Sequence, residues 1–342
     1  MSASDKHRGR VPALLDIEVT NYCNARCVMC PRDKMPPLGS MDRETWKRVV
    51  DRAVEYGPIA SFAIGGLGEP LMHRQIGEFI AMAADAGLKP SMITNGSLLT
   101  EDMARTLVKA GLANVNVSIG GYRKTTYEQV QVGLNFETVY RNLLRFLEIS
   151  HGRTNLNVQI SPTVESLAEA EDIAAYWRSA GAAFCTMFPQ SSNRGGALDA
   201  DNKHLLHKDN AGGQPLPRGV LNIETLLGPS RLADTLIRSR APFPCAGKDY
   251  VTFIGWEGMY YVCNSDFQKT HPLGSVMQMS LEAAYQAKAG LNRENCGVCA
   301  CCTLIGRNPP PRGLSFYVGV PLYLVGTAWA RFRGRRRHPD LD

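Results

Sequence analysis

The stretch Ile17-Glu-Val-Thr-Asn-Tyr-Cys23-Asn-Ala-Arg-Cys27-Val-Met-Cys30 decides the fold, because it joins a short apolar run, residues 14–20, to three closely spaced cysteines. Three thiolates with the spacing C-x3-C-x2-C hold three corners of a cubane iron–sulfur cluster and leave its fourth iron open to a small molecule. A zinc ion would lack one of its four ligands here, and a redox Cys-x-x-Cys pair would leave Cys23 unexplained. The loop therefore predicts a cluster held by Cys23, Cys27 and Cys30.

Five more apolar runs of strand length follow, at residues 60–65, 89–94, 114–120, 155–162 and 182–188. Segments with helical periodicity lie between them, at residues 43–55, 75–86, 100–110, 136–149 and 167–179. This alternation predicts an α/β fold with a parallel sheet, either flat or curled into a partial barrel, and with helices outside. In both geometries, ligand sites gather at the carboxyl ends of the strands.

Short motifs stand at those strand ends. The second strand ends in Gly65-Gly66-Leu67-Gly68-Glu69-Pro70, where glycine allows a ligand to approach the backbone closely. The third ends in Thr94-Asn95-Gly96, and Ser118 lies near the end of the fourth. On the fifth, Gln159 and Ser161 are candidate ribose or carboxylate contacts, although ordinary strand alternation explains them equally well.

Taken in order, these motifs resemble those of the radical S-adenosylmethionine (radical SAM) superfamily. The resemblance implies a partial (β/α)6 barrel in which a 4Fe–4S cluster on the three cysteines binds S-adenosylmethionine and yields a 5′-deoxyadenosyl radical. Two positions depart from the family pattern: Gly120 replaces a usual aspartate, and Met29 replaces a usual aromatic residue but can still pack on adenine. The implied cofactor-binding residues are Met29, Gly65, Gly66, Gly68, Glu69, Thr94, Asn95, Ser118, Gln159 and Ser161.

A second group of cysteines lies near the carboxyl end of the chain, which has ten in all. Cys245, twelve residues, Gly258, four residues and Cys263 resemble the opening of the SPASM module of radical SAM enzymes, and Cys296-Gly-Val-Cys299 resembles its continuation. Because Ile305 stands where the full module has its next cysteine, the shorter twitch form is favoured. It implies a second 4Fe–4S cluster on Cys245, Cys263, Cys296 and Cys299. Cys302 could replace Cys296, and a zinc ribbon is the alternative.

The chain is expected to divide into four parts. These are a radical SAM partial barrel at residues 12–190, a connector or substrate loop at 191–244, the small cysteine-rich twitch/SPASM-like module at 245–305, and a tail at 306–342. Residues 313–330 of the tail carry no charge, and five arginines follow them. Packing of this tail on the barrel is favoured over contact with a membrane.

Charge and targeting signals indicate which binding partners and which cellular location to expect. The net charge is +6, and residues 331–342 carry five arginines and two aspartates, so +3 of it lies in that short segment. No basic stripe with interleaved aromatic residues stands out, so nucleic acid is not an expected partner. The polar amino terminus lacks a secretory signal, which predicts a cytoplasmic protein.

The resemblance also suggests a reaction. Members with a single auxiliary cluster include epimerases and dehydrogenases of aminoglycoside-like compounds, which favours a glycoside or aminocyclitol substrate and a flavodoxin or ferredoxin as reductant. Cys185 lies near the end of the sixth predicted strand, where a thiol can give a hydrogen atom to a substrate radical. It is equally well explained as an inert core residue. Redox-neutral epimerisation with Cys185 as donor is our first expectation, with dehydrogenation or peptide modification as alternatives.

Overall fold

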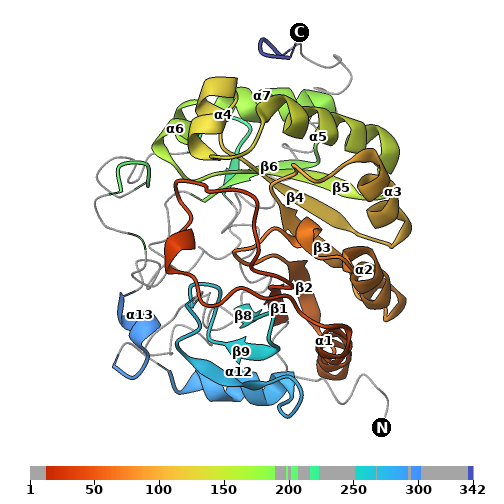
Figure 1. Ribbon diagram of the computed structural model, residues 1–342, viewed down its shortest axis with the longest axis vertical. Helices are drawn as coiled ribbons and strands as arrows, with labels where there is room; N and C mark the ends of the chain where they lie inside the picture. Colours follow the sequence, from red (N-terminus) through yellow and green to blue (C-terminus); the bar gives the residue numbers. More distant parts are fainter. Residues whose placement is uncertain are drawn as a thin grey trace, which may run out of the picture.

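The computed structural model describes residues 13–188, 198, 202–206, 216–222, 251–266, 268–291, 294–301 and 338–341, and in them the strands form one ten-stranded sheet. Its order is β10-β9-β8-β1-β2-β3-β4-β5-β6-β7, and β8 and β1 to β7 are all parallel (Figure 1). The first seven strands are Ala13–Ile17, Ile59–Ile64, Pro90–Thr94, Asn114–Ile119, Asn155–Ile160, Phe184–Met187 and Leu221–Asn222. The predicted α/β class and parallel sheet are confirmed, with each of the six predicted strands present within a few residues.

Helices follow these strands as the periodicity predicts. They are α1 (Arg43–Tyr56), α2 (Ile76–Asp85), α3 (Glu101–Lys109), α4 (Lys124–Val130), α5 (Phe136–Ser150), α6 (Val164–Ala168) and α7 (Ala170–Ala180), with short 3-10 helices at η1 (Arg32–Lys34) and η2 (Pro70–Met72). Side-chain caps fix several starts: Asp42, Thr100, Asn135 and Thr163 each accept a bond from the backbone N–H three residues on. The single helix expected over 167–179 is two, α6 and α7, because the chain breaks at Glu169.

The two faces of the parallel strands differ in polarity. On β4 and β5, Val115, Val117, Val158 and Ile160 are fully buried in the hydrophobic core beneath the helices. Their neighbours on the other face are polar, and Asn157 donates a 3.1 Å hydrogen bond to Asn116 across the strand pair. This polar face forms the inner wall of the partial barrel, so polar ligands can be held there.

The carboxyl-terminal strands continue the barrel sheet. β8 (Val251–Ile254) pairs in parallel with β1, and β9 (Met259–Tyr261) and β10 (Pro272–Ser275) add to it antiparallel. Helices α12 (Leu281–Ala289) and α13 (Gly297–Cys301) follow, and Figure 1 shows α12 beside β9 at the β10 end of the sheet. The strands of the second cysteine region therefore share one hydrogen-bonded ladder with β1.

Residues 338–341 lie against the other end of the barrel. His338 is buried, with its ring 4.3 Å from that of Tyr122 and 5.0 Å from that of Tyr140. The backbone N–H of Lys124 donates to the carboxylate of Asp340. The apolar segment 313–330 lies outside the described residues, so its contacts stay a prediction. In the part of the chain that is described, no helix combines the length and the apolar character needed to span a membrane.

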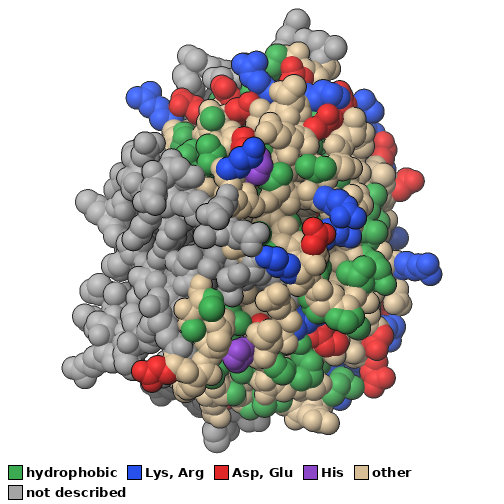
Figure 2. Space-filling view, turned by 60° about the vertical axis from the view of Figure 1, so that its left-hand side comes forward, with side chains coloured by type: hydrophobic (Ala, Val, Ile, Leu, Met, Phe, Trp, Pro, Cys, Tyr) green, Lys and Arg blue, Asp and Glu red, His purple; other side chains and the backbone are tan. Residues whose placement is uncertain are grey.

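Basic and acidic side chains are interspersed on the face shown in Figure 2. Lysine and arginine there alternate with aspartate and glutamate over the described part of the surface. The positive net charge is thus not gathered into one basic patch on that part of this face.

Candidate active site

The loop after β1 holds Cys23, Cys27 and Cys30 at the carboxyl end of the sheet, and each of the three is half-buried. Its backbone rests on the end of α4: Arg26 N–H donates to Val132 C=O at 2.8 Å, and Val28 N–H donates to Val130 C=O at 3.0 Å. The loop is therefore fixed on both sides of Cys27 by main-chain bonds, which holds the three thiols on one short, anchored turn.

The three thiols act on one another electrostatically. Burial, followed by the charges of Cys30 and Cys23, raises the pKa of the Cys27 thiol to about 12, and burial also raises the pKa of Cys23. Among the described residues, no trio of His, Cys, Asp or Glu side chains already has its donor atoms gathered around one point. The fit of a cluster therefore rests on the donor chemistry: adjacent iron ions favour the thiolate forms that burial and mutual repulsion disfavour.

Glu69 ties the glycine turn to the end of β3. Its fully buried carboxylate accepts hydrogen bonds from Thr94 Oγ1 at 2.7 Å, Asn95 N–H at 2.8 Å and Leu71 N–H at 3.0 Å. Burial raises the pKa of this carboxyl group against the opposing effect of those bonds. The Glu69 N–H in turn donates to the carbonyl of Tyr22, beside the first cysteine. These hydrogen bonds of Glu69 connect the glycine turn and the end of β3 to the cysteine loop, and we call them the Glu69 bracket.

Glycine is required at two positions of this turn. Gly66 has a φ of +92°, and a Cβ there would lie 2.7 Å from the Cβ of Glu18. A Cβ at Gly68 would lie 2.0 Å from the carbonyl oxygen of Thr20, a distance that no repacking of side chains relieves. The turn is therefore pressed directly onto the chain that leads into the cysteines.

The remaining predicted cofactor contacts lie on the same side of the sheet. Ser118 and Gln159 are register partners on β4 and β5, and Asn95 donates to Asn24 in the cysteine loop at 3.0 Å. Ser161 is 3% exposed, and its hydroxyl has no hydrogen-bond partner within the described structure. An orphaned buried hydroxyl of this kind fits a polar ligand that the protein alone does not supply. Met29 is half-buried, and a Cβ at Gly65 would lie 3.1 Å from Asp16 Oδ1.

Cys185 does not lie where a hydrogen-atom donor is needed. It is fully buried and pairs in register with Val158, whose side chain belongs to the outer core. Its thiol lies 3.9 Å from the carbonyl oxygen of Ala174 on α7. The alternation of β6 directs this side chain outward beneath the helices, which favours the inert core residue over the hydrogen-atom donor.

Three of the four predicted auxiliary ligands meet in a second cluster of buried residues. Cys263, Cys296 and Cys299 pack together with Val262 and Val298. A cavity of about 270 Å³ lies beside them, and its lining includes Asp266, Thr270, His271 and Gly297. Cys245 and Cys302 lie outside the described residues, so the choice of the fourth ligand stays a prediction. The three cysteines share one small cluster of buried residues, and their donor chemistry fits an iron–sulfur cluster or a zinc ion.

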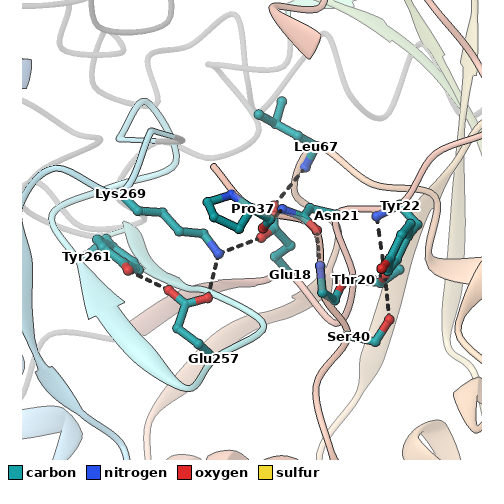
Figure 3. A network of polar contacts seen from close by, with 11 residues as sticks. Glu18, Thr20, Asn21, Tyr22, Pro37, Ser40, Leu67, Glu257, Tyr261 and Lys269 are labelled. Carbon is teal, nitrogen blue, oxygen red and sulfur yellow. Dashed lines mark hydrogen bonds and ion pairs between the residues drawn. The ribbon is translucent and has the colours of Figure 1, made fainter. Parts of the chain in front are cut away.

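A buried ion-pair network, absent from the sequence predictions, joins the two cysteine regions (Figure 3). Lys269 Nζ lies 3.0 Å from Glu18 Oε1 and also binds Glu257, which accepts from the hydroxyl of Tyr261. Glu18 accepts from Leu67 N–H of the glycine turn at 3.3 Å. Burial raises the pKa of the Glu18 carboxyl, and the Lys269 ammonium opposes that rise. A charged residue at the end of an apolar strand was the available sequence signal for Glu18, whereas Lys269 had none.

The first part of the chain is similar to a known protein family. The Radical SAM superfamily model matches residues 17–174. Over 172 residues the chain is 24% identical to a tungsten-containing aldehyde ferredoxin oxidoreductase cofactor-modifying protein of Pyrococcus furiosus, covering 49% of this chain and 48% of that protein. The chain spans about half the length of the curated relatives it matches.

Solved structures show the same fold over most of the chain. The structure of BtrN in complex with AdoMet and 2-DOIA has a TM-score of 0.54 at 17% identity, covering 89% of this chain and 96% of that one. Streptococcus suis SuiB bound to precursor peptide SuiA has a TM-score of 0.62 at 14% identity, covering 85% and 70%. At these identities the likeness concerns the arrangement of the elements.

Proposed function

We propose that the protein is a radical SAM enzyme that oxidises a carbinol carbon of a small glycoside or aminocyclitol, and the match of residues 17–174 to the Radical SAM superfamily model supports this proposal. The observation that carries the proposal is the anchored loop of Cys23, Cys27 and Cys30, bonded through Tyr22 to the Glu69 bracket. When bound, S-adenosylmethionine and two 4Fe–4S clusters would supply a 5′-deoxyadenosyl radical, which removes the carbon-bound hydrogen atom, and an acceptor for the remaining electron, while the hydroxyl proton would leave to solvent.

The protein's own residues hold and orient these groups. Cys23, Cys27 and Cys30 would bind the first cluster, with the backbone of Gly65, Gly66 and Gly68 beside the cofactor. Glu69 keeps the glycine turn and the Thr94–Asn95 strand end in a fixed relation through its three buried hydrogen bonds. Ser118, Gln159 and the orphaned hydroxyl of Ser161 would bind polar groups of S-adenosylmethionine, and Met29 would pack on its adenine. Cys245, Cys263, Cys296 and Cys299 would bind the auxiliary cluster.

The position of Cys185 favours oxidation of the substrate over epimerisation. Epimerisation needs a hydrogen-atom donor facing the substrate, and this thiol lies on the helix side of the sheet beside Ala174. Oxidation needs instead an electron acceptor within the protein. The presence of Cys263, Cys296 and Cys299 in one cluster of buried residues supports such an acceptor.

Peptide modification is a second candidate. It is supported by the likeness to SuiB bound to its precursor peptide, which extends over 85% of this chain. A short precursor peptide encoded beside this protein, and converted by it, would favour the peptide over the glycoside. We propose a cytoplasmic location and a flavodoxin or ferredoxin as the reductant in either case.

Anaerobic reconstitution tests the cofactor content. The wild type is expected to bind about eight irons per chain and to release 5′-deoxyadenosine in the presence of a reductant. Replacement of Cys23, Cys27 and Cys30 by serine should leave about four irons and abolish 5′-deoxyadenosine. Two zinc ions per chain without cofactor cleavage would instead indicate a structural metal-binding protein.

Reaction with candidate substrates in deuterium oxide separates the reaction types. Oxidation gives a carbonyl product without solvent deuterium at the attacked carbon. Epimerisation gives a product of unchanged oxidation state with one solvent deuterium there, and that result would overturn the proposed oxidation.

A further inference from the structure

The segment that carries Cys263 is held at two ends by different parts of the molecule. At one end, Asp266 N–H donates to Cys263 C=O at 3.1 Å, and the Asp266 carboxylate accepts from the N–H groups of Thr270 and His271. His271 Nε2 then accepts from Gly297 N–H at 3.2 Å, next to Cys296. This chain of bonds places Cys263 against the Cys296–Cys299 turn.

At the other end, Lys269 reaches from this segment to the barrel. Its ammonium group lies between Glu18, at the end of β1, and Glu257, in the turn between β8 and β9 (Figure 3). The side chains of Lys269 and Glu18 are only 8% and 2% exposed, so this contact is made in the interior. Lys269 also has a positive φ of 60°, a left-handed backbone conformation that is strained for a non-glycine residue.

We propose that Lys269 is a positioning residue that locks the Cys263 segment onto the glycine turn of the radical SAM barrel. The inference rests on the proposed function in one respect, namely that Cys263 binds the auxiliary cluster. Glu18 completes the connection, because its second carboxylate oxygen accepts from Leu67 N–H within the glycine turn. A continuous set of bonds therefore runs from the turn beside the first cluster to the ligands of the second.

The consequence is a fixed geometry between the two clusters. A buried ion pair broken on one side leaves an uncompensated charge. The bond that Gln268 Nε2 of the same segment donates to Lys34 C=O is exposed and 3.5 Å long, so it cannot replace this buried contact. Small displacements of reacting groups reduce rates by an order of magnitude or more. Loss of the Lys269 ammonium should therefore uncouple substrate oxidation from cofactor cleavage.

The test compares Lys269→Met with Lys288→Met. Lys288 is also a buried lysine of the carboxyl-terminal half, but it donates to Val251 C=O and Thr252 Oγ1 and anchors α12 to β8. Lys269→Met is expected to form on the order of tenfold less product per 5′-deoxyadenosine, to change the magnetic interaction between the reduced clusters, and to retain about eight irons. Lys288→Met should keep the wild-type ratio and interaction, and Lys269→Arg should restore most of both.

A charge-neutral double variant separates positioning from simple stability. Lys269→Met alone leaves Glu18 buried without its cation, whereas Glu18→Gln/Lys269→Met removes the charge from both sides. The double variant should regain the urea midpoint but not the product ratio. Recovery of both quantities, or a wild-type ratio in Lys269→Met, would overturn the positioning role.

Hydrogen exchange on the cluster-free protein provides a readout that does not depend on the proposed function. The amides of Leu67 and Asp266 should exchange faster in Lys269→Met than in wild type or Lys288→Met. Equal exchange in all three would contradict the lock. If instead the wild type binds about four irons while exchange responds as expected, the result contradicts the proposed auxiliary cluster and still supports the positioning role of Lys269.

Discussion

Replacing Glu69 by glutamine removes a charge and one acceptor site from the bracket that joins the glycine turn to β3, with almost no change in volume. Glu69 Oε1 accepts from Thr94 Oγ1 and Leu71 N–H, and Glu69 Oε2 accepts from Asn95 N–H. The glutamine amide keeps a single acceptor oxygen. Whichever way it is turned, its NH2 group faces at least one backbone N–H, so a buried donor loses its partner.

The size of the effect follows from this count. A hydrogen bond to a charged group contributes about 1.5–3 kcal/mol, and a buried donor without a partner costs about 1–3 kcal/mol. Relief from burying the carboxylate charge offsets part of that loss. The lost bond and the donor left without a partner are the same change, so their energies are not added in full. We expect Glu69→Gln to lower the free energy of unfolding by about 2–4 kcal/mol.

Urea unfolding of the cluster-free protein measures this value, with an unchanged slope against denaturant as evidence that the compactness of both states is preserved. Glu78→Gln is the matched control, because Glu78 is a surface residue that binds Arg43 and Gln75. A loss in Glu69→Gln no greater than that in the control would refute the bracket as the source of stability.

The stability difference between the wild type and Glu69→Gln should depend on pH. Burial raises the folded-state pKa of Glu69 above its ordinary value of 4.5, so the folded state binds the proton more tightly than the unfolded state. Stability contributed by this group is complete below pH 4.5 and is lost as pH rises through the folded-state pKa. The difference between wild type and Glu69→Gln should therefore shrink as pH increases from that value.

Three further substitutions test other parts of the structure. Cys185→Ala should retain its product and coupling ratio while losing about 1 kcal/mol of stability from the missing sulfur, and a loss of product with normal folding would return this thiol to the reaction. Gly68→Ala should destabilise the protein by about 3 kcal/mol or more, because its Cβ meets Thr20 C=O, whereas Gly290→Ala has no atom within 4 Å and should be neutral by the same urea assay. Ser161→Ala should be neutral or stabilising without ligand, because it deletes an unsatisfied hydroxyl, yet weaken binding of S-adenosylmethionine measured by calorimetry; unchanged affinity would remove Ser161 from the cofactor site.

Strands and long helices were predictable because their patterns are simple. Runs such as residues 114–120 alternate apolar and polar side chains, and the structure buries Val115, Val117 and Ile119 accordingly. The helix Lys124–Val130 was missed because it spans only two turns and carries no apolar stripe. The break between α6 and α7 was missed because it depends on distant donors: the Glu169 carboxylate accepts from Tyr122 N–H and Thr126 Oγ1.

Motif order placed the candidate site residues on one side of the sheet, but it could not orient every side chain. In β6, Cys185, Thr186 and Met187 are all buried, so apolar character gives no indication of which residues face the barrel interior. Only the register with β5 settles it, since Cys185 pairs with Val158 and Thr186 with Gln159. Register between parallel strands depends on packing across the sheet, which a local pattern does not contain.

The relation between the two cysteine regions shows what long-range pairing adds. The sequence suggests two separate metal sites, one after β1 and one in a small module, yet β8 bonds directly to β1 with Ile254 opposite Ile17. Neighbouring strands lie about 4.8 Å apart, so the loops that leave their carboxyl ends start side by side. Lys269, in the segment between β9 and β10, then joins these two loops in the interior, because it binds Glu18 after β1 at 3.0 Å and Glu257 after β8. We therefore expect the distance between the two proposed clusters to depend on the sheet and on this buried ion pair.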